Sequence, residues 1–384
     1  MEIVKKYITN RGKLIFSAVF LSLFVILPIL ALVFSVVKID TSNFQYLWDN
    51  LLFEYSLDTI YLITITSIFS LLFGILPAWY MSTNEFKFKN IYDIFLYLPL
   101  AIPAYIMAFT YSDVLSYTGP IQSFSRKYFP DLADLINQDY LQIELLGIIM
   151  ALSLYPYIYT ACRLSFSLIG SNYINLSRSL GMSRLKTFFK IVIPLSRVAI
   201  FSGLFLVVME VLNEYGAVKY FGVNTFTSGI FRSWYSMGDV ETASLLAVLL
   251  FLIVVVFFSI ERYLNARYKF NYTPNTKKFK NEPPSLKNRI IIHMVCLIPI
   301  ILGFLIPVLF IINNVIYEFS RIDFEKVFNL TTNTVIVSLI SSVIIVVIAV
   351  YFQFLKRILK NKTITFFNEV ISLTYALPGA VIGL

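Results

Sequence analysis

The sequence has few of the residues that build enzyme and metal sites in soluble proteins. Its 384 residues include two cysteines and one histidine, and only 14% are charged, against about 25% in an average soluble domain. Cys162 and Cys296 lie in apolar runs without CxxC or Cys/His spacing, which argues against a disulfide framework and a metal site. The lone His293 makes neither a zinc site nor a catalytic triad. We expect all three side chains to serve in packing, His293 at a membrane interface.

Apolar residues are abundant. They make up 58% of the chain, with 36 Phe and 25 Tyr, so too few polar groups remain to cover a soluble globule. The formal charge of +9 could indicate a nucleic-acid partner, but the basic residues lie between apolar runs and not along one stripe. The sequence therefore predicts an all-α integral membrane protein in a lipid bilayer, with no nucleic-acid partner.

Apolar runs long enough to cross a bilayer as a helix recur along the whole chain. A span needs about 20 residues with few charges. Nine runs meet this condition: Leu14–Val37, Ser56–Met81, Ile91–Tyr111, Ile143–Phe166, Val198–Val218, Thr242–Ile260, Ile290–Asn313, Thr334–Leu355 and Ile364–Leu384.

Lysine and arginine predict the orientation of these spans. With the N-terminus on the cytoplasmic side, 24 of the 31 basic residues fall on that side and seven on the other. Such an excess is the signature of cytoplasmic loops. We expect a multi-pass protein with a cytoplasmic N-terminus.

An internal repeat divides the chain. Asp58-Thr59 and Asn333-Thr334 are 275 residues apart, and so are the motifs at 101–104 and 376–379. Repeated halves are common in transporters. The repeat predicts a first unit of six helices at 1–263, a basic linker at 264–288, and the first three helices of a second unit at 289–384. A complete second unit would extend about 150 residues past Leu384, so we expect the natural protein to be longer, with a natural nine-span protein as the alternative.

The segment 170–197 between the fourth and fifth spans is long and amphipathic. Ser171 or Asn172 can cap a short helix, and Gly181 suits the left-handed position after its end. A second helical stretch then reaches Pro194, where we expect the pattern to end and the next span to begin. These helices would display the basic residues Arg178, Arg184, Lys186 and Lys190. A helix held on anionic lipid is the simplest interpretation.

The spacing within this segment resembles the coupling motif of ABC importer permeases, in which Glu-Ala-Ala, three residues, Gly and nine residues precede Ile-x-Leu-Pro. Gly181 is followed by nine residues and then by Ile191-Val192-Ile193-Pro194, so that Ile193 replaces Leu. Asn175-Leu176-Ser177 stands where Glu-Ala-Ala is expected, and Arg178 follows. The resemblance implies a coupling helix that docks on a separate ATP-binding subunit and includes Arg184.

Further stretches are similar to the ferric-iron permeases of this family, which are fused tandem copies of the unit. They are Leu98–Tyr105, Tyr117–Pro120, Glu210–Val223 and Phe226–Asp239. The resemblance implies a type I importer fold, two copies of the ATPase subunit, a periplasmic substrate-binding protein and the bacterial inner membrane. Thiamine, sulfate or a polyamine are the rival substrates.

The sequence has no phosphate-binding loop of the Walker type. The only Gly-Lys pair, Gly12-Lys13, has Tyr7 at the position of the first glycine and Leu14 after the lysine. We therefore expect a transport subunit and not an enzyme. It would bind no cofactor of its own, and the partner ATPase would use the ATP.

Polar residues inside the spans are candidates for the translocation path. Glu210 lies in the fifth span, with Asn213 and Glu214 at helical spacing. Tyr155 and Tyr159 align with Arg163 on the fourth span. Carboxylate and phenol oxygens suit hard ferric iron as transient ligands. The alternative is that these groups bond to neighbouring helices or lie at the interface.

Two other function classes stay open. A secondary transporter is also built from repeats with polar residues in the membrane, but it leaves the pattern from Gly181 to Pro194 unexplained. A membrane-anchored scaffold without transport is the third possibility.

Overall fold

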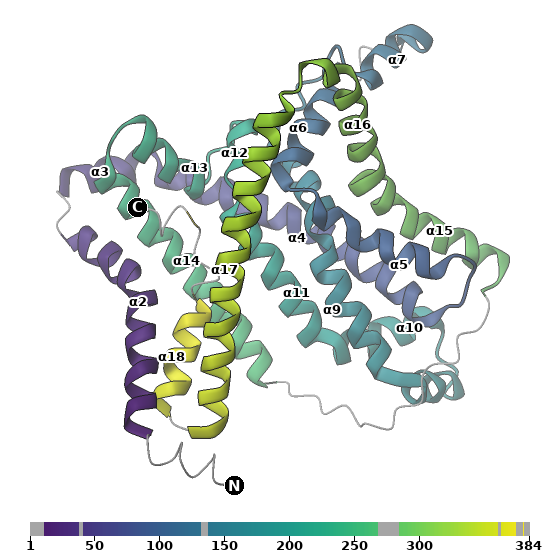
Figure 1. The fold of residues 1–384 in the computed structure, drawn as a ribbon. Helices are drawn as coiled ribbons and strands as arrows, with labels where there is room; N and C mark the ends of the chain where they lie inside the picture. Colours follow the sequence, from purple (N-terminus) through teal and green to yellow (C-terminus); the bar gives the residue numbers. More distant parts are fainter. Residues whose placement is uncertain are drawn as a thin grey trace. The chain divides into compact units, whose positions relative to one another are not determined.

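The computed structural model describes residues 11–37, 41–131, 137–267, 284–359, 362–373 and 379. The chain forms two compact units (Figure 1). The large unit is Thr41–Ile312, and the small unit combines Met1–Asp40 with Asn313–Leu384.

Almost all described residues are helical. The helices before residue 270 are α2 (Arg11–Val37), α3 (Thr41–Asn50), α4 (Leu52–Thr83), α5 (Lys89–Tyr97), η1 (Leu98–Ala101), α6 (Ala104–Leu115), α7 (Pro120–Tyr128), α9 (Ile143–Ser179), α10 (Arg184–Thr187), η2 (Phe188–Val192), α11 (Ile193–Asn213), α12 (Gly216–Phe221), α13 (Phe226–Phe231), η3 (Arg232–Ser236) and α14 (Val240–Arg267). Those after it are α15 (Leu286–Ile300), η4 (Ile301–Leu305), α16 (Ile306–Glu318), η5 (Phe319–Arg321), α17 (Phe324–Leu359) and α18 (Lys362–Leu373).

The core of the large unit is α9, which packs against α4 and α11 (Figure 1). Two glycines allow the close approach. A Cβ atom on Gly74 of α4 would lie 2.8 Å from the Ile158 side chain, and one on Gly203 of α11 would lie 2.9 Å from the Ile158 Cα. Small residues at such contacts let helix backbones approach closely in membranes. Ile158 is fully buried as a result.

The predicted span Ile91–Tyr111 is not one straight helix. Its axis turns by 94° between Lys89–Ala101 and Ala104–Tyr128. Pro99 and Pro103 explain the break, because each lacks the N–H that a continuous helix needs. Ile102, between them, has an extended backbone.

The remaining predicted spans agree with the structure in part. Among the described residues, six helices are long and apolar enough to cross a membrane, and up to eight if each of two bent pairs is one span, so the count of nine is not confirmed. The fifth span ends at Asn213 and not at Val218, because a separate helix, α12, begins at Gly216. The ninth begins as α18, and its remainder except Gly379 lies outside the described residues.

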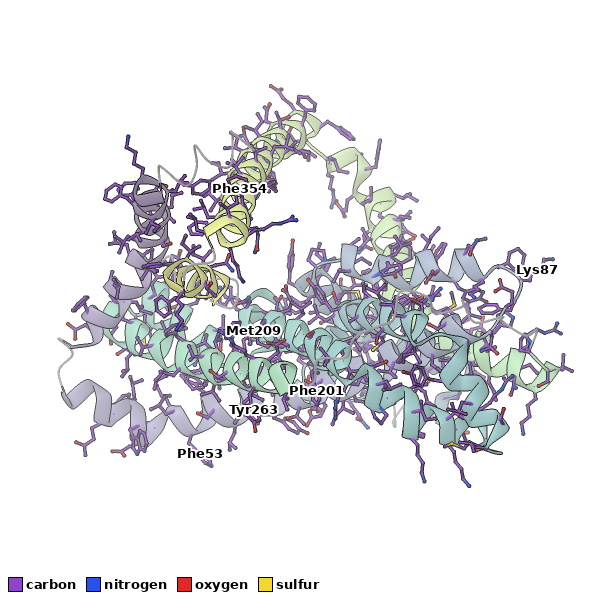
Figure 2. The ribbon with its side chains drawn as sticks, turned by 90° about the horizontal axis from the view of Figure 1, so that it is seen from below. Phe53, Lys87, Phe201, Met209, Tyr263 and Phe354 are labelled. Atoms are coloured by element: carbon purple, nitrogen blue, oxygen red, sulfur yellow. The ribbon has the colours of Figure 1, made fainter. Side chains whose placement is uncertain are left out.

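Large apolar side chains cover much of the molecular surface (Figure 2). Phe53 on α4 is 74% exposed, and Figure 2 shows it pointing away from the helices. In α17 of the small unit, only 6% of an 18-residue apolar stretch of the helix is buried. Surfaces of this kind suit lipid or another apolar helix and not water.

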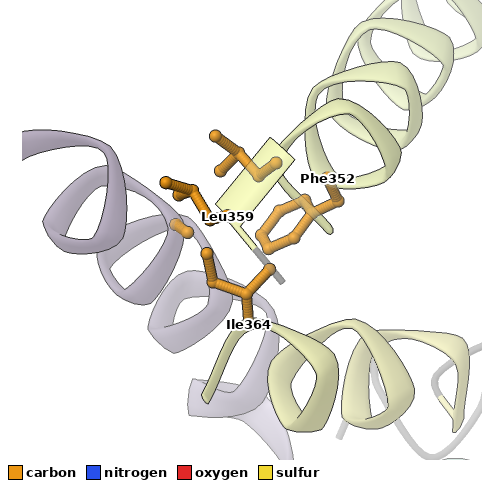
Figure 3. Packing of buried hydrophobic residues seen from close by; sticks show 5 residues of the cluster. Phe352, Leu359 and Ile364 are labelled. Carbon is orange, nitrogen blue, oxygen red and sulfur yellow. The ribbon is translucent and has the colours of Figure 1, made fainter. Parts of the chain in front are cut away.

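The small unit has its own apolar core between α2, α17 and α18. Ala18, Phe352, Leu355, Leu359 and Ile364 form a buried cluster, and Figure 3 shows Phe352, Leu359 and Ile364 converging. Ser17 of α2 hydrogen-bonds Tyr351 of α17. The first helix of the chain therefore packs with the helices that follow residue 324.

In the large unit, α15 and η4 pack on α5 and α9. The Tyr92 hydroxyl lies 2.8 Å from His293 Nδ1, and the rings of Phe95 and Phe304 are 5.9 Å apart in an edge-on arrangement. Tyr111 donates to the Leu302 carbonyl at 2.5 Å. The prediction that His293 serves in packing is thus confirmed, and both Cys162 and Cys296 are buried and free.

The contact at Gly203 predicts a specific loss of stability. Gly203→Ala places a methyl group against the α9 backbone, and overpacking of this kind costs about 1–3 kcal/mol. We expect a melting temperature several degrees below wild type in detergent, measured by tryptophan fluorescence. Gly12→Ala is the control, since a Cβ atom there meets nothing within 4 Å. Equal melting temperatures for the two variants would contradict the close-approach interpretation.

Candidate functional site

A pocket of about 230 Å³ lies where the broken helix meets α9 and α11. We call it the acidic pocket. Its lining residues are Leu100, Ile102, Pro103, Ala104, Met150, Ser153, Leu154, Tyr157, Glu210 and Glu214. Two of the five residues that the sequence analysis proposed for a translocation path, Glu210 and Glu214, are among them.

The break between η1 and α6 forms one wall of this pocket. The hydroxyl of Ser153 donates to the Ile102 carbonyl at 2.9 Å, which satisfies a backbone acceptor that the interrupted helix leaves free. Irregular backbone at membrane depth is tolerated where protein groups satisfy it or where it lines a cavity. Both conditions hold here, so the prolines create the pocket and Ser153 stabilises it.

Glu210 lies in the last turn of α11 and reaches the pocket beside a tyrosine. The Tyr157 hydroxyl lies 3.2 Å from Glu210 Oε1 and donates to it. A carboxylate with a phenol neighbour presents oxygen atoms and negative charge to the cavity. Tyr157 was missed by the sequence analysis, because the aligned series Tyr155, Tyr159 and Arg163 marks a different face of α9.

Glu214 has a structural contact in addition to its place in the pocket. Its Oε1 accepts from the Ala217 backbone N–H at 2.8 Å. A carboxylate at the start of a helix satisfies a free N–H and complements the helix dipole. Glu214 therefore lies just after the fifth span, and its carboxylate caps the first turn of α12. The same side chain lines the acidic pocket.

The other three predicted path residues do not line this pocket. Tyr155 and Tyr159 are fully buried between helices, and the buried Oδ1 of Asn213 has no hydrogen-bond partner among the described residues. Tyr159 donates to Asp93 of α5, whose Oδ1 also lies 3.6 Å from Arg163 Nε. Tyr159 and Arg163 thus join α9 to α5 in the helix packing.

In the described ranges, no group of three or more His, Cys, Asp and Glu side chains could hold a metal ion. The acidic pocket has two carboxylates, Glu210 and Glu214. It can bind a cation transiently, but it does not have the ligand set of a permanent metal centre.

The predicted helix cap at Ser171 or Asn172 is wrong. Both residues lie inside α9, which continues to Ser179. Without a proline between Gly170 and Ser179, nothing interrupts the backbone hydrogen bonds of the helix.

Gly181 has the left-handed conformation that its position predicted, with φ of +71°. The Met182 N–H donates to the Ser177 carbonyl at 3.0 Å, which is the bond that closes a Schellman motif. The Ser177 hydroxyl also hydrogen-bonds Thr187 at 2.9 Å. The turn at Gly181 is therefore fixed from both sides.

The predicted end of a helix at Pro194 is also wrong. A helix runs from Arg184 to Asn213, with Ser183 capping its first turn. The wide π turn η2 ends at Val192, two residues before Pro194. Such bulges accompany local changes in helix hydrogen bonding, so the ring and the missing N–H of Pro194 are accommodated without a break.

One aromatic side chain of η2 anchors the 170–197 segment to the spans. Phe188 is buried, with its ring 5.2 Å from Trp79 of α4 and 6.5 Å from Phe166 of α9. The next residue, Phe189, is 65% exposed. Phe188 thus joins this segment to α4 and α9 through ring contacts.

The remaining predicted residues of the segment lie on its surface or at its base. Leu176, Arg184 and Pro194 are exposed, whereas Ile191 and Ile193 are half-buried. The side chains of Asn175 and Arg178 lie outside the described part of the chain. Leu180, Leu185 and Phe189 add exposed apolar side chains, so the segment presents an apolar and basic surface.

Comparisons with known proteins identify relatives of this architecture. The profile described as "Binding-protein-dependent transport system inner membrane component" matches residues 70–270. The sulfate transport system permease protein CysT of Salmonella typhimurium is 26% identical over 213 residues, 54% of this chain and 73% of the relative.

Two further relatives differ in the cargo that their names state. The Fe(3+)-transport system permease protein FbpB 2 of Haemophilus influenzae is 26% identical over 231 residues, which are 60% of this chain but only 41% of that relative. The molybdenum transport system permease protein ModB of Azotobacter vinelandii is 23% identical over 43% of this chain and 71% of its own length.

A solved structure shows the same fold. A chain from the crystal structure of a bacterial ABC transporter involved in the import of the acidic polysaccharide alginate is similar, with a TM-score of 0.55 and 15% identity. The match covers 70% of this chain and 99% of the other.

The anchor at Phe188 predicts how the 170–197 segment responds to truncation. Phe188→Ala removes a buried ring, a change that costs about 3–5 kcal/mol in packed cores, so the segment should detach locally. We expect trypsin to cut at Arg184, Lys186 and Lys190 several times faster than in wild type. The matched control is Phe189→Ala, whose ring is exposed. Unchanged cleavage of Phe188→Ala would show that the ring does not anchor the segment.

Proposed function

Because this chain belongs to the ABC importer permeases described as binding-protein-dependent transport system inner membrane components, we propose that it forms the translocation path of a bacterial importer for ferric iron. The family is supported by the match over residues 70–270. The choice of iron rests on the acidic pocket.

The charge of the acidic pocket favours a cation. Glu210 and Glu214 line it together with Tyr157, and the described lining residues include no lysine or arginine. Carboxylate rings select cations in membrane pores, and hard metal ions prefer oxygen ligands. Among the cargoes that the relatives' names state, sulfate and molybdate would be repelled at this point, whereas ferric iron would be attracted.

Sulfate is the second candidate. The similarity to CysT extends over 73% of that relative, a larger share than the alignment covers of the iron-transport relative. Uptake of radioactive iron and of radioactive sulfate by the same proteoliposomes separates the two cargoes.

Energy would come from a separate ATP-binding subunit, in two copies, that grips the 170–197 segment on the cytoplasmic face. The exposed surface of Leu176, Leu180, Leu185 and Phe189 suits a protein interface. Phe188 would transmit the movement to Trp79 and Phe166. The chain itself would hold no cofactor, since the partner uses the ATP, and a periplasmic binding protein would deliver the cargo.

The chain would comprise a first permease unit at 1–263, a linker at 264–288 and part of a second unit at 289–384, with the N-terminus in the cytoplasm. Helix packing supports this division. The first helix of the first permease unit, α2, packs with α17 and α18 of the second, and the first helix of the second, α15, packs with α5 of the first.

Glu210 provides the direct test of the cation path. Glu210→Gln keeps the side-chain shape and removes one charge, so we expect iron uptake by the assembled transporter to fall about tenfold or more. Assembly with the ATPase should persist. Glu144→Gln, at an exposed carboxylate on α9, is the matched control and should transport normally. Normal uptake by Glu210→Gln would rule out a role for this charge.

Gly181 provides the test of coupling. Valine is strained at positive φ, whereas asparagine tolerates it. Gly181→Val should therefore abolish most stimulation of the ATPase by the loaded binding protein, and Gly181→Asn should retain most of it. Purification of the complex with its ATPase subunit controls for assembly. Full stimulation of both variants would contradict a coupling role for the turn.

A further inference from the structure

The short helix α7 has the reverse polarity of a helix that faces water. Its buried residues are Gln122 and Ser125, whereas Ile121, Phe124 and Tyr128 are 43%, 57% and 56% exposed. These three apolar side chains share one face, at positions i, i+3 and i+7. A helix at the surface of a soluble protein buries its apolar face and exposes its polar one. The exposed face of α7 therefore suits an apolar medium.

Aromatic rings are concentrated at the end of this face. The Phe124 ring lies 4.7 Å from that of Tyr128 and 6.2 Å from that of Phe129. Phe129, the residue after the helix, is 53% exposed. Aromatic side chains are common where the hydrocarbon core of a bilayer meets its headgroups, and Tyr is enriched there because its ring is apolar and its hydroxyl polar.

Two cations accompany the apolar face. Arg126 and Lys127 lie in the last turn of α7. Arg126 Cζ lies 3.9 Å from the centre of the Tyr117 ring, and Lys127 Nζ lies 5.1 Å from that of Tyr128. Within the described residues, neither side chain forms an ion pair with Asp or Glu. Both therefore have N–H donors for an anionic group outside the chain.

The combination of these features favours lipid over a protein partner. Lysine is depleted in protein interfaces, whereas Lys127 is exposed directly beside the aromatic rings. Helices that lie in the plane of a membrane surface carry Lys or Arg on the polar side and large apolar residues on the other. Basic residues at such a surface are attracted to anionic lipid headgroups.

α7 is fixed on the end of α6, and Figure 1 shows it beyond that end. The Gln122 side chain donates to the Leu115 carbonyl at 2.7 Å. The turn between the helices is tight, because a Cβ atom on Gly119 would overlap the carbonyl oxygen of Asp113. α6 begins at Ala104, which lines the acidic pocket. The position of α7 is therefore linked through α6 to one wall of that pocket.

We propose that α7 is an interfacial anchor that lies in the outer surface of the bilayer. Its apolar face would contact the acyl chains, and Arg126 and Lys127 would bind the headgroups of anionic phospholipids. In the predicted topology α7 follows the third span and lies on the outer side. The anchor would hold the outer end of α6 at a fixed depth. The inference requires a chain that spans a membrane, but no particular cargo.

The test is the depth of α7, measured by electron paramagnetic resonance on the complete transporter in nanodiscs. A nitroxide label at Phe124→Cys or Tyr128→Cys should collide severalfold more often with oxygen, which concentrates in hydrocarbon, than with a water-soluble nickel chelate. The matched control is Ser123→Cys, since Ser123 is exposed on another face of the same helix, and its label should favour the nickel chelate. The native cysteines are buried, so the label reacts at the introduced one.

A second measurement tests the anionic headgroups. Nanodiscs of phosphatidylcholine mixed equally with phosphatidylglycerol should raise the ratio of oxygen to nickel collisions at Phe124→Cys above that in phosphatidylcholine alone. Arg126→Gln with Lys127→Gln should abolish this dependence on lipid charge. Lys219→Gln with Arg232→Gln is the control, because it removes two other basic residues that the topology places on the outer side and should leave the dependence unchanged.

Each contrary result has a definite meaning. Nickel collisions as frequent at Phe124→Cys and Tyr128→Cys as at Ser123→Cys would place α7 in water and overturn the anchor. Protection of both labels from both reagents would overturn it in favour of a protein contact. The same depth in both lipid mixtures would overturn the binding of anionic headgroups. None of these measurements depends on the cargo, so their failure would leave the proposed importer function intact.

Discussion

The need to satisfy every backbone hydrogen bond without water governs this fold. In a bilayer an N–H or C=O without a partner costs several kcal/mol, so the apolar segments that the structure describes are helical nearly throughout. Two of the places where the helical pattern changes are informative for that reason. At Ile102 the carbonyl is satisfied by Ser153, and before Pro194 the backbone widens into a π turn. The first opens the acidic pocket, and the second lies at the base of the segment proposed for coupling.

Composition and charge were sufficient to predict the membrane class and most spans, because hydropathy and helix length are properties of single segments. The left-handed turn at Gly181 was predicted for the same reason: its signal is local. The break at Pro99 and Pro103 carried a local signal too, since two prolines within five residues interrupt helix hydrogen bonding. The count of spans considered only apolar length and charge, so the segment around these prolines was predicted as one continuous helix.

The candidate site was only partly predictable. Glu210 and Glu214 stand out as carboxylates in an apolar chain. Tyr157 and Ser153 do not, because their roles depend on which face of α9 meets α11 and the broken helix. Tyr155 and Tyr159 lie outside the acidic pocket for the same reason: alignment along a helix shows that side chains share a face but not what that face contacts. Tertiary contacts such as the one between Gly203 and Ile158 decide that question.

Two early helices, α2 and α5, pack with helices that come much later in the chain, and this has a consequence for biosynthesis. Tyr92 bonds His293, 201 residues later in the chain, and Ser17 bonds Tyr351, 334 residues later. At about 5–20 residues per second, synthesis of the first interval takes roughly 10–40 s. During that time α5 lacks its packing partner α15. The interval between the synthesis of α2 and that of α17 is longer still. The order in which the ribosome delivers helices therefore differs from the order in which they pack, and the nascent chain must hold its early helices apart from wrong neighbours until the late ones arrive.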